Sequence, residues 1–128
     1  ATIQAVKQQF PDRELIAVME LHTFSSLNEN FLNEYANTMD NADEAIVFID
    51  KLTFLQKRMV PYAESVVKAA FSNKKVKFFN NTEILKQFLS SINYKRKNLL
   101  LMSSGNFGNM DLIRLKNQIF DHLSKINK

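Results

Sequence analysis

Short apolar runs alternate along the chain with longer stretches in which apolar residues recur every three or four positions. The runs are four or five residues long and rich in Leu, Ile and Val, which is typical of buried strands. They predict strands at 15–19, 45–49, 76–79 and 99–102, the third being the weakest. The helical spacing predicts helices at 1–10, 31–39, 61–70, 80–92 and 112–126, and 50–60 is interpreted as a loop with a short helix.

This regular alternation of helix and strand predicts an α/β fold. The expected architecture is a three-layer, Rossmann-like domain with a mostly parallel sheet and helices on both faces. A chain of 128 residues is long enough for one such domain, 1–128, and too short for two. Ligands of these sheets bind beyond the carboxyl ends of the strands. We therefore expect function in the stretches that begin at Glu20, Asp50 and Ser103.

Helix-start signals support several of these elements. Ser26 and Glu29 have the spacing of a capping box, and Asn80 with Glu83 resembles a second cap. Pro61 is predicted as the first residue of its helix. The first helix has no capping residue before it, so we expect the chain to be cut from a longer one just inside this element; a processed native terminus is the alternative.

The chain's two glycines, Gly105 and Gly108, both lie in the predicted turn between the last strand and the last helix. Glycine permits positive φ and close approach of the backbone, and a strand-to-helix turn leaves N–H groups free to bind an anion. Ser103, Ser104 and Asn106 could add hydrogen bonds. Two interpretations stay open: an anion site, or a tight turn that needs glycine for its geometry alone.

A second polar cluster follows the first predicted strand. It consists of Glu20, His22, Thr23, Ser25 and Ser26. Such a density of polar side chains suits the binding of a polar substrate, and it equally suits capping of the next helix. His122 is interpreted as a surface residue of the last helix, and Asp50 with Lys51 as a solvated loop.

Composition excludes several kinds of function. The chain has no cysteine, so it has no disulfide and no thiolate nucleophile, which fits a reducing, cytoplasmic location. No apolar run approaches the roughly 20 residues of a membrane span, and no signal peptide is visible. Neither metal-ligand spacing nor a P-loop is present. The net charge of +4 comes with small basic clusters at 74–77 and 95–97, interpreted as solvated; a nucleic-acid interface is the weakest hypothesis.

The order and spacing of several motifs resemble the C-terminal domain of Mur ligases, over essentially the whole chain. His22, Phe24 and Ser25 match the family's His-Arg-Tyr/Phe-Thr/Ser-Arg motif, and 41–44 match its Asp-Ala-Asp-Glu-like turn. The segment 99–108 is similar to Met-Ser-Asn-Gly-Gly-Phe-Gly of the murein-peptide ligases. The two family arginines are replaced by Thr23 and Ser26, which favours a tripeptide over alanine as the substrate. The family's Asp-x-Ala-His-His-Pro segment would lie just before Ala1.

The resemblance implies an ATP-dependent ligase as the parent protein. It would join L-alanyl-γ-D-glutamyl-meso-diaminopimelate, or L-alanine, to UDP-N-acetylmuramate through an acyl phosphate. ATP and Mg²⁺ would bind mainly to a central domain outside this chain, and the parent would also have an N-terminal domain. The isolated domain would then be inactive, without catalytic residues or a metal of its own. The polar cluster 20–26, together with Ser104, Gly105, Asn106 and Gly108, would bind substrate. A flavodoxin-like module that binds a phosphate without catalysis is the alternative; no nucleic acid or membrane partner is expected.

Overall fold

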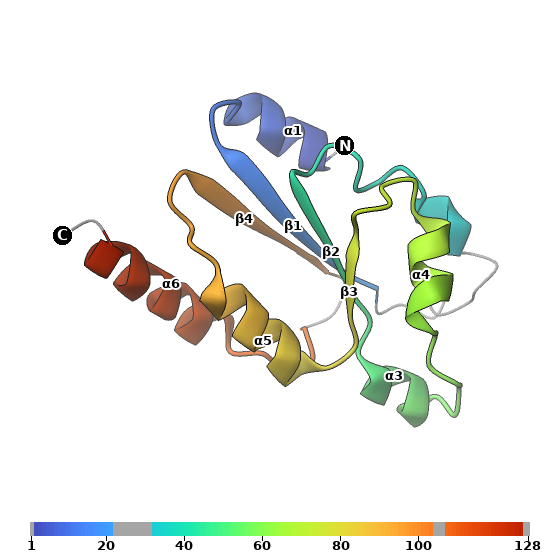
Figure 1. The fold of residues 1–128 in the computed structure, drawn as a ribbon. Helices are drawn as coiled ribbons and strands as arrows, with labels where there is room; N and C mark the ends of the chain where they lie inside the picture. The colour runs from blue at the N-terminus through green and yellow to red at the C-terminus, as the bar shows by residue number, and fades with distance from the viewer. Residues whose placement is uncertain (1, 22–31, 104–106, 127–128) are drawn as a thin grey trace.

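The computed structural model describes residues 2–21, 32–103 and 107–126, and these ranges form a three-layer α/β domain (Figure 1). Four parallel strands make one sheet in the order β3-β2-β1-β4. The strands are β1 (Glu14–Glu20), β2 (Glu44–Phe48), β3 (Lys77–Phe79) and β4 (Lys97–Ser103). The helices described are α1 (Thr2–Gln9), the 3-10 helix η1 (Asn33–Tyr35), α3 (Lys51–Gln56), α4 (Glu64–Ala70), α5 (Thr82–Ser91) and α6 (Leu112–Ile126). The predicted fold class is confirmed.

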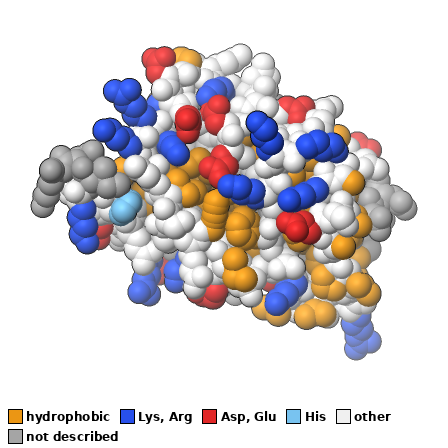
Figure 2. All heavy atoms as spheres, viewed as in Figure 1, with side chains coloured by type: hydrophobic (Ala, Val, Ile, Leu, Met, Phe, Trp, Pro, Cys, Tyr) orange, Lys and Arg blue, Asp and Glu red, His pale blue; other side chains and the backbone are white. Residues whose placement is uncertain are grey.

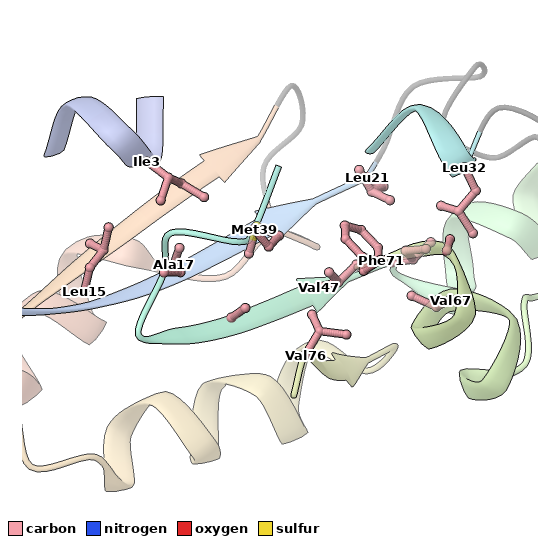
Figure 3. Close-up of a cluster of buried hydrophobic side chains, with 14 of the residues drawn as sticks. Ile3, Leu15, Ala17, Leu21, Leu32, Met39, Val47, Val67, Phe71 and Val76 are labelled. Atoms are coloured by element: carbon pink, nitrogen blue, oxygen red, sulfur yellow. The ribbon is translucent and has the colours of Figure 1, made fainter. Parts of the chain in front are cut away.

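Alternate residues of the central strands enter two separate cores, as strands covered on both faces require. Leu15 and Ala17 of β1 pack on one face with α1, α4 and the segment around Met39, which Figure 3 shows in close-up. Ile16 and Val18 pack on the opposite face with α5 and α6. The continuous apolar runs of the sequence thus encode a sheet between two helical layers.

The predicted helix at 31–39 is wrong over most of its described length. Leu32 is α-helical, but η1 follows it at once, and turns continue from there up to residue 41. The carbonyl of Ala36, which would accept from residue 40 in an α-helix, accepts instead from the backbone N–H and the hydroxyl of Ser72, at 2.8 and 2.9 Å. Met39 is fully buried. The apolar spacing therefore reports burial in this segment, and tertiary contacts determine its backbone.

Two predicted helix starts are displaced. Pro61 lies three residues before α4, in the segment 59–63, which has no regular secondary structure. The ring of Tyr62 in this segment packs edge-on against Phe54, with 4.8 Å between the centroids. Asn81, rather than Asn80, caps α5: its side chain accepts from the N–H of Ile84 at 3.1 Å. The carbonyl of Asn80 instead accepts from the N–H of Lys51, at the start of α3.

Asp43 connects several elements at the amino-terminal ends of the strands. Its carboxylate accepts from the backbone N–H of Leu15 at 2.7 Å and pairs with Lys7 of α1. Partial burial alone would raise the pKa of Asp43, but these two hydrogen bonds and the positive charge of Lys7 outweigh it and hold the pKa below its usual value. This one side chain therefore links α1, β1 and the start of β2.

The surface of the face drawn in Figure 2 carries lysines and arginines interspersed with acidic side chains. Lys77 of the first basic cluster pairs with Glu44 at 2.6 Å, and Lys97 of the second lies 3.6 Å from Glu14. Both clusters thus lie at the amino-terminal ends of strands. Within the described ranges, no helix combines the length and apolar character that crossing a membrane requires.

Candidate functional site

The carboxyl ends of the strands bring separate polar stretches of the sequence together. Glu20, the last residue of β1, lies in register with Ser103, the last residue of β4. The chain leaves β1 toward β2 on one side, whereas β4 lies on the other side of β1. The position between β1 and β4 is therefore the topological switch point of the sheet, where ligands of open α/β folds bind.

Glu20 is the central side chain of this edge. It is only 4% exposed, although carboxyl groups are costly to bury without hydrogen bonds. Its Oε1 accepts from the backbone N–H of Phe107 at 2.9 Å and from the hydroxyl of Ser103. Its Oε2 is buried as well and has no hydrogen-bond partner among the residues that the structure describes. Glu20 thus fixes the turn that follows β4.

The turn after β4 has an uncommon backbone. Phe107, Gly108 and Asn109 are successive residues with φ of 54°, 63° and 62°, in the left-handed region that favours glycine. The ring of Phe107 is buried and stacks on Phe48 of β2, with 6.4 Å between the centroids. The turn is therefore anchored to the core by the Phe107 ring and to β1 by Glu20.

Gly108 is also enclosed by side chains. A Cβ added to it would lie 2.8 Å from Oδ2 of Asp50 and still closer to Oγ1 of Thr82, at the start of α5. Real Cβ atoms do not approach other atoms this closely. The predicted need for glycine is thus confirmed at position 108. The atoms that leave no room for a Cβ belong to Asp50 and Thr82 of the protein itself.

Asp50 contradicts its interpretation as part of a solvated loop. It is 9% exposed, lies two residues after the end of β2, and caps α3 by accepting from the N–H of Leu52 at 3.0 Å. Lys51 is exposed, as expected. The useful signal in the sequence is an aspartate at the junction of a strand and a helix, which is a preferred N-cap.

Two of the predicted site residues, Glu20 and Gly108, are described and lie at this edge. Glu20 accepts a hydrogen bond from the N–H of Phe107, the residue before Gly108. The other predicted residues, His22, Thr23, Ser25, Ser26, Ser104, Gly105 and Asn106, lie outside the described residues. Sequence reasoning singled out the stretches that contain Asp50 and Phe107 without giving these two residues a role, and it missed Thr82. No group of three or more His, Asp or Glu side chains suited to a metal occurs in the described ranges. His122 is exposed on α6, as predicted.

This fold has a counterpart among solved structures. A crystal structure attributed to a domain of a UDP-N-acetylmuramate:L-alanyl-γ-D-glutamyl-meso-diaminopimelate ligase from Haemophilus ducreyi 35000HP superimposes with a TM-score of 0.53. The match covers 95% of this chain and 78% of that chain, at 19% sequence identity. The two chains share a fold. No protein family model matches the sequence. The fold expected from the resemblance to Mur ligases is thus the fold observed, and the switch point with Glu20 is the candidate site of this domain.

Proposed function

We propose that this chain is the amine-substrate domain of an ATP-dependent peptidoglycan ligase. The parent enzyme would join L-alanyl-γ-D-glutamyl-meso-diaminopimelate, or L-alanine, to UDP-N-acetylmuramate in the cytoplasm. The main support is the fold shared with a domain attributed to such a ligase, which extends over 95% of this chain. ATP and Mg²⁺ would bind to the central domain of the parent and activate the muramoyl carboxyl group as an acyl phosphate.

The chemistry of the described edge favours an amine over a phosphate. The N–H of Phe107, which could bind an anion in a strand-to-helix turn, is already occupied by the carboxyl group of Glu20. The second oxygen of Glu20 remains without a partner among the described residues, and Asp50 is a further buried carboxyl group at the same edge. Carboxylates form strong, charge-assisted hydrogen bonds with ammonium groups. This supports binding of the amino end of a peptide, rather than a phosphate-binding module.

In this proposal the domain positions its substrate and performs no covalent step. The edge would hold the amine beside the acyl phosphate, and closure of the domain over the central domain would exclude water. Glu20 acts by fixing the turn at Phe107 and by attracting the amine. The isolated chain should therefore release no ADP from ATP in the presence of UDP-N-acetylmuramate and peptide.

The test is ADP release by the full-length protein with UDP-N-acetylmuramate and either the tripeptide or alanine. We expect release that depends on the tripeptide. Glu20→Gln keeps an acceptor for Phe107 but removes the charge, and should lower kcat/KM for the tripeptide by about tenfold, the effect of one charged hydrogen bond. Glu64→Gln, an exposed carboxyl group on α4, is the matched control and should behave as wild type. Release independent of any amine would contradict the proposal.

A further inference from the structure

Ser103, the last residue of β4, has a hydroxyl group that donates a hydrogen bond to Glu20. The register of the sheet brings the two side chains together, because Glu20 and Ser103 are partners in the parallel pair of β1 and β4. Side chains alternate between the two faces of a sheet along each strand. Val18 and Leu101 pack with α5 and α6, so Glu20 and Ser103, each two residues further on, are directed to that same face. The contact is therefore built into the pairing of the strands.

Two donors hold the same oxygen of Glu20. The backbone N–H of Phe107 donates to Oε1 at 2.9 Å, and the hydroxyl group of Ser103 donates to it as well. Oε2 is the oxygen that remains for a ligand, since it has no hydrogen-bond partner among the residues that the structure describes. It is also buried. A ligand reaches a buried atom only by displacing the atoms that cover it, so part of the site must move when an amine binds to Glu20.

The two donors differ in how firmly the fold holds them. Phe107 belongs to a turn in which three successive residues have positive φ. Ser103 belongs to a strand whose seven residues, from Lys97 to Ser103, all pair with β1. Paired strands open less readily than turns. Ser103 is therefore the donor whose position does not depend on the turn.

We propose that Ser103 is a positioning residue for the substrate amine. Its hydroxyl group holds Oε1 of Glu20 while the amine enters, so that Oε2 meets the ammonium group in a fixed orientation. The inference rests on the proposed function, in which Glu20 attracts the amine. It gives Ser103 a role other than the hydrogen bond to an anion that the sequence suggested, because a hydroxyl group has one proton to donate and Glu20 accepts it.

Steady-state ADP release by the full-length protein tests this role. Ser103→Ala should raise KM for the tripeptide about fivefold and leave kcat within about twofold, because the amine is held equally in the ground state and the transition state. Ser103→Thr keeps the hydroxyl group and should restore KM to nearly the wild-type value. Ser91→Ala is the matched control and should behave as wild type. It removes a serine hydroxyl group that donates to the carbonyl of Phe88 at 2.7 Å, in the last turn of α5.

A double-mutant cycle shows whether Ser103 acts through Glu20. Glu20→Ala removes the acceptor, so Ser103→Ala should change kcat/KM by less than about twofold in that background. Two substitutions whose effects on kcat/KM multiply would refute the proposal, because the hydroxyl group would then act independently of Glu20. A Ser103→Ala enzyme with the KM of wild type would refute it as well.

Amide hydrogen exchange in the 128-residue chain gives a readout that needs no ligase activity. In Ser103→Ala, the amide of Phe107 should exchange about threefold faster, because its acceptor on Glu20 is held less firmly. The amide of Met110, which donates to the carbonyl of Phe107 in the same turn at 3.2 Å, should be unaffected. Equal acceleration of both amides would show a general loosening of the turn and would refute a specific action on Glu20.

The two assays separate this inference from the proposed function. An enzyme that is active on the tripeptide and insensitive to Ser103→Ala contradicts only the positioning role. A protein without ligase activity that depends on the tripeptide contradicts the proposed function, and with it the role toward an amine, even where the Phe107 amide responds to the substitution.

Discussion

Gly108 gives the sharpest test of how the candidate site is built. In Gly108→Ala, the alanine must adopt a φ of +63°, which costs about 1–2 kcal/mol for a residue with a Cβ. The new methyl group also overlaps Oγ1 of Thr82 and lies 2.8 Å from Oδ2 of Asp50, and overpacking of this kind costs roughly 1–3 kcal/mol. We therefore expect the free energy of unfolding to fall by about 2–5 kcal/mol.

The assay is urea unfolding followed by circular dichroism. The expected loss lowers the midpoint by roughly 1–3 M urea at the slope typical of small domains. In a double-mutant cycle, Thr82→Ala should restore about 1–2 kcal/mol to Gly108→Ala, because it removes the hydroxyl group that the methyl group overlaps. Asn109→Ala is the control, since Asn109 has a φ of 62° and already carries a Cβ; it should cost about 1 kcal/mol or less. A Gly108→Ala protein as stable as wild type would refute this account of the turn.

Three further substitutions test other parts of the fold. Asp43→Asn should lower the free energy of unfolding by about 1 kcal/mol at pH 7. The folded state lowers the pKa of Asp43 below 3.8, so the difference in stability between the variant and wild type should be constant above about pH 5. Thermal melts repeated toward pH 3 should show this difference shrinking. Tyr94→Phe leaves the carbonyl of Leu89 without its donor at 2.6 Å and should cost about 1 kcal/mol at neutral pH. Burial, and then the charge of Glu44, raise the pKa of Tyr94 in the folded state. The stability that the neutral phenol contributes is therefore complete below about pH 10 and is lost as the pH rises further. If Tyr94→Phe lost the same stability at alkaline pH in thermal melts, Tyr94 would not be the group responsible. Arg96→Gly should leave stability unchanged or raise it by up to about 1 kcal/mol in urea titrations, because Arg96 is exposed and has a φ of 58°; a clear loss would show that its side chain matters.

The parts of the fold that follow from local pattern could be predicted from the sequence. The apolar runs located all four strands, because burial on both faces requires every position to be apolar. The segment 31–39 could not be predicted correctly, since the bond between Ala36 and Ser72 joins residues far apart in the chain. The start of α4 was misplaced as well, since Pro61 and Tyr62 belong to a segment without regular secondary structure in which the ring of Tyr62 packs on Phe54.

The part of the candidate site that lies at the carboxyl ends of the strands could be predicted from the sequence. Glu20 and Gly108 were found because parallel strands all end at one edge and because glycine marks a positive φ. Thr82 was missed and Asp50 was misread as a solvated loop residue, because both lie close to Gly108 in a way that no spacing in the sequence encodes. The stacking of Phe107 on Phe48 is likewise a long-range contact.

The register of the central strand pair has a consequence for how the domain assembles. Glu14 pairs with Lys97 and Glu20 with Ser103. Strand β1 can therefore pair with β4 only after more than 80 further residues have been synthesised. Contacts between such distant positions slow folding and tend to form after local ones. The switch point is made of these two strands. We therefore expect the candidate site to form in the last step of folding, so that no partly folded chain contains it.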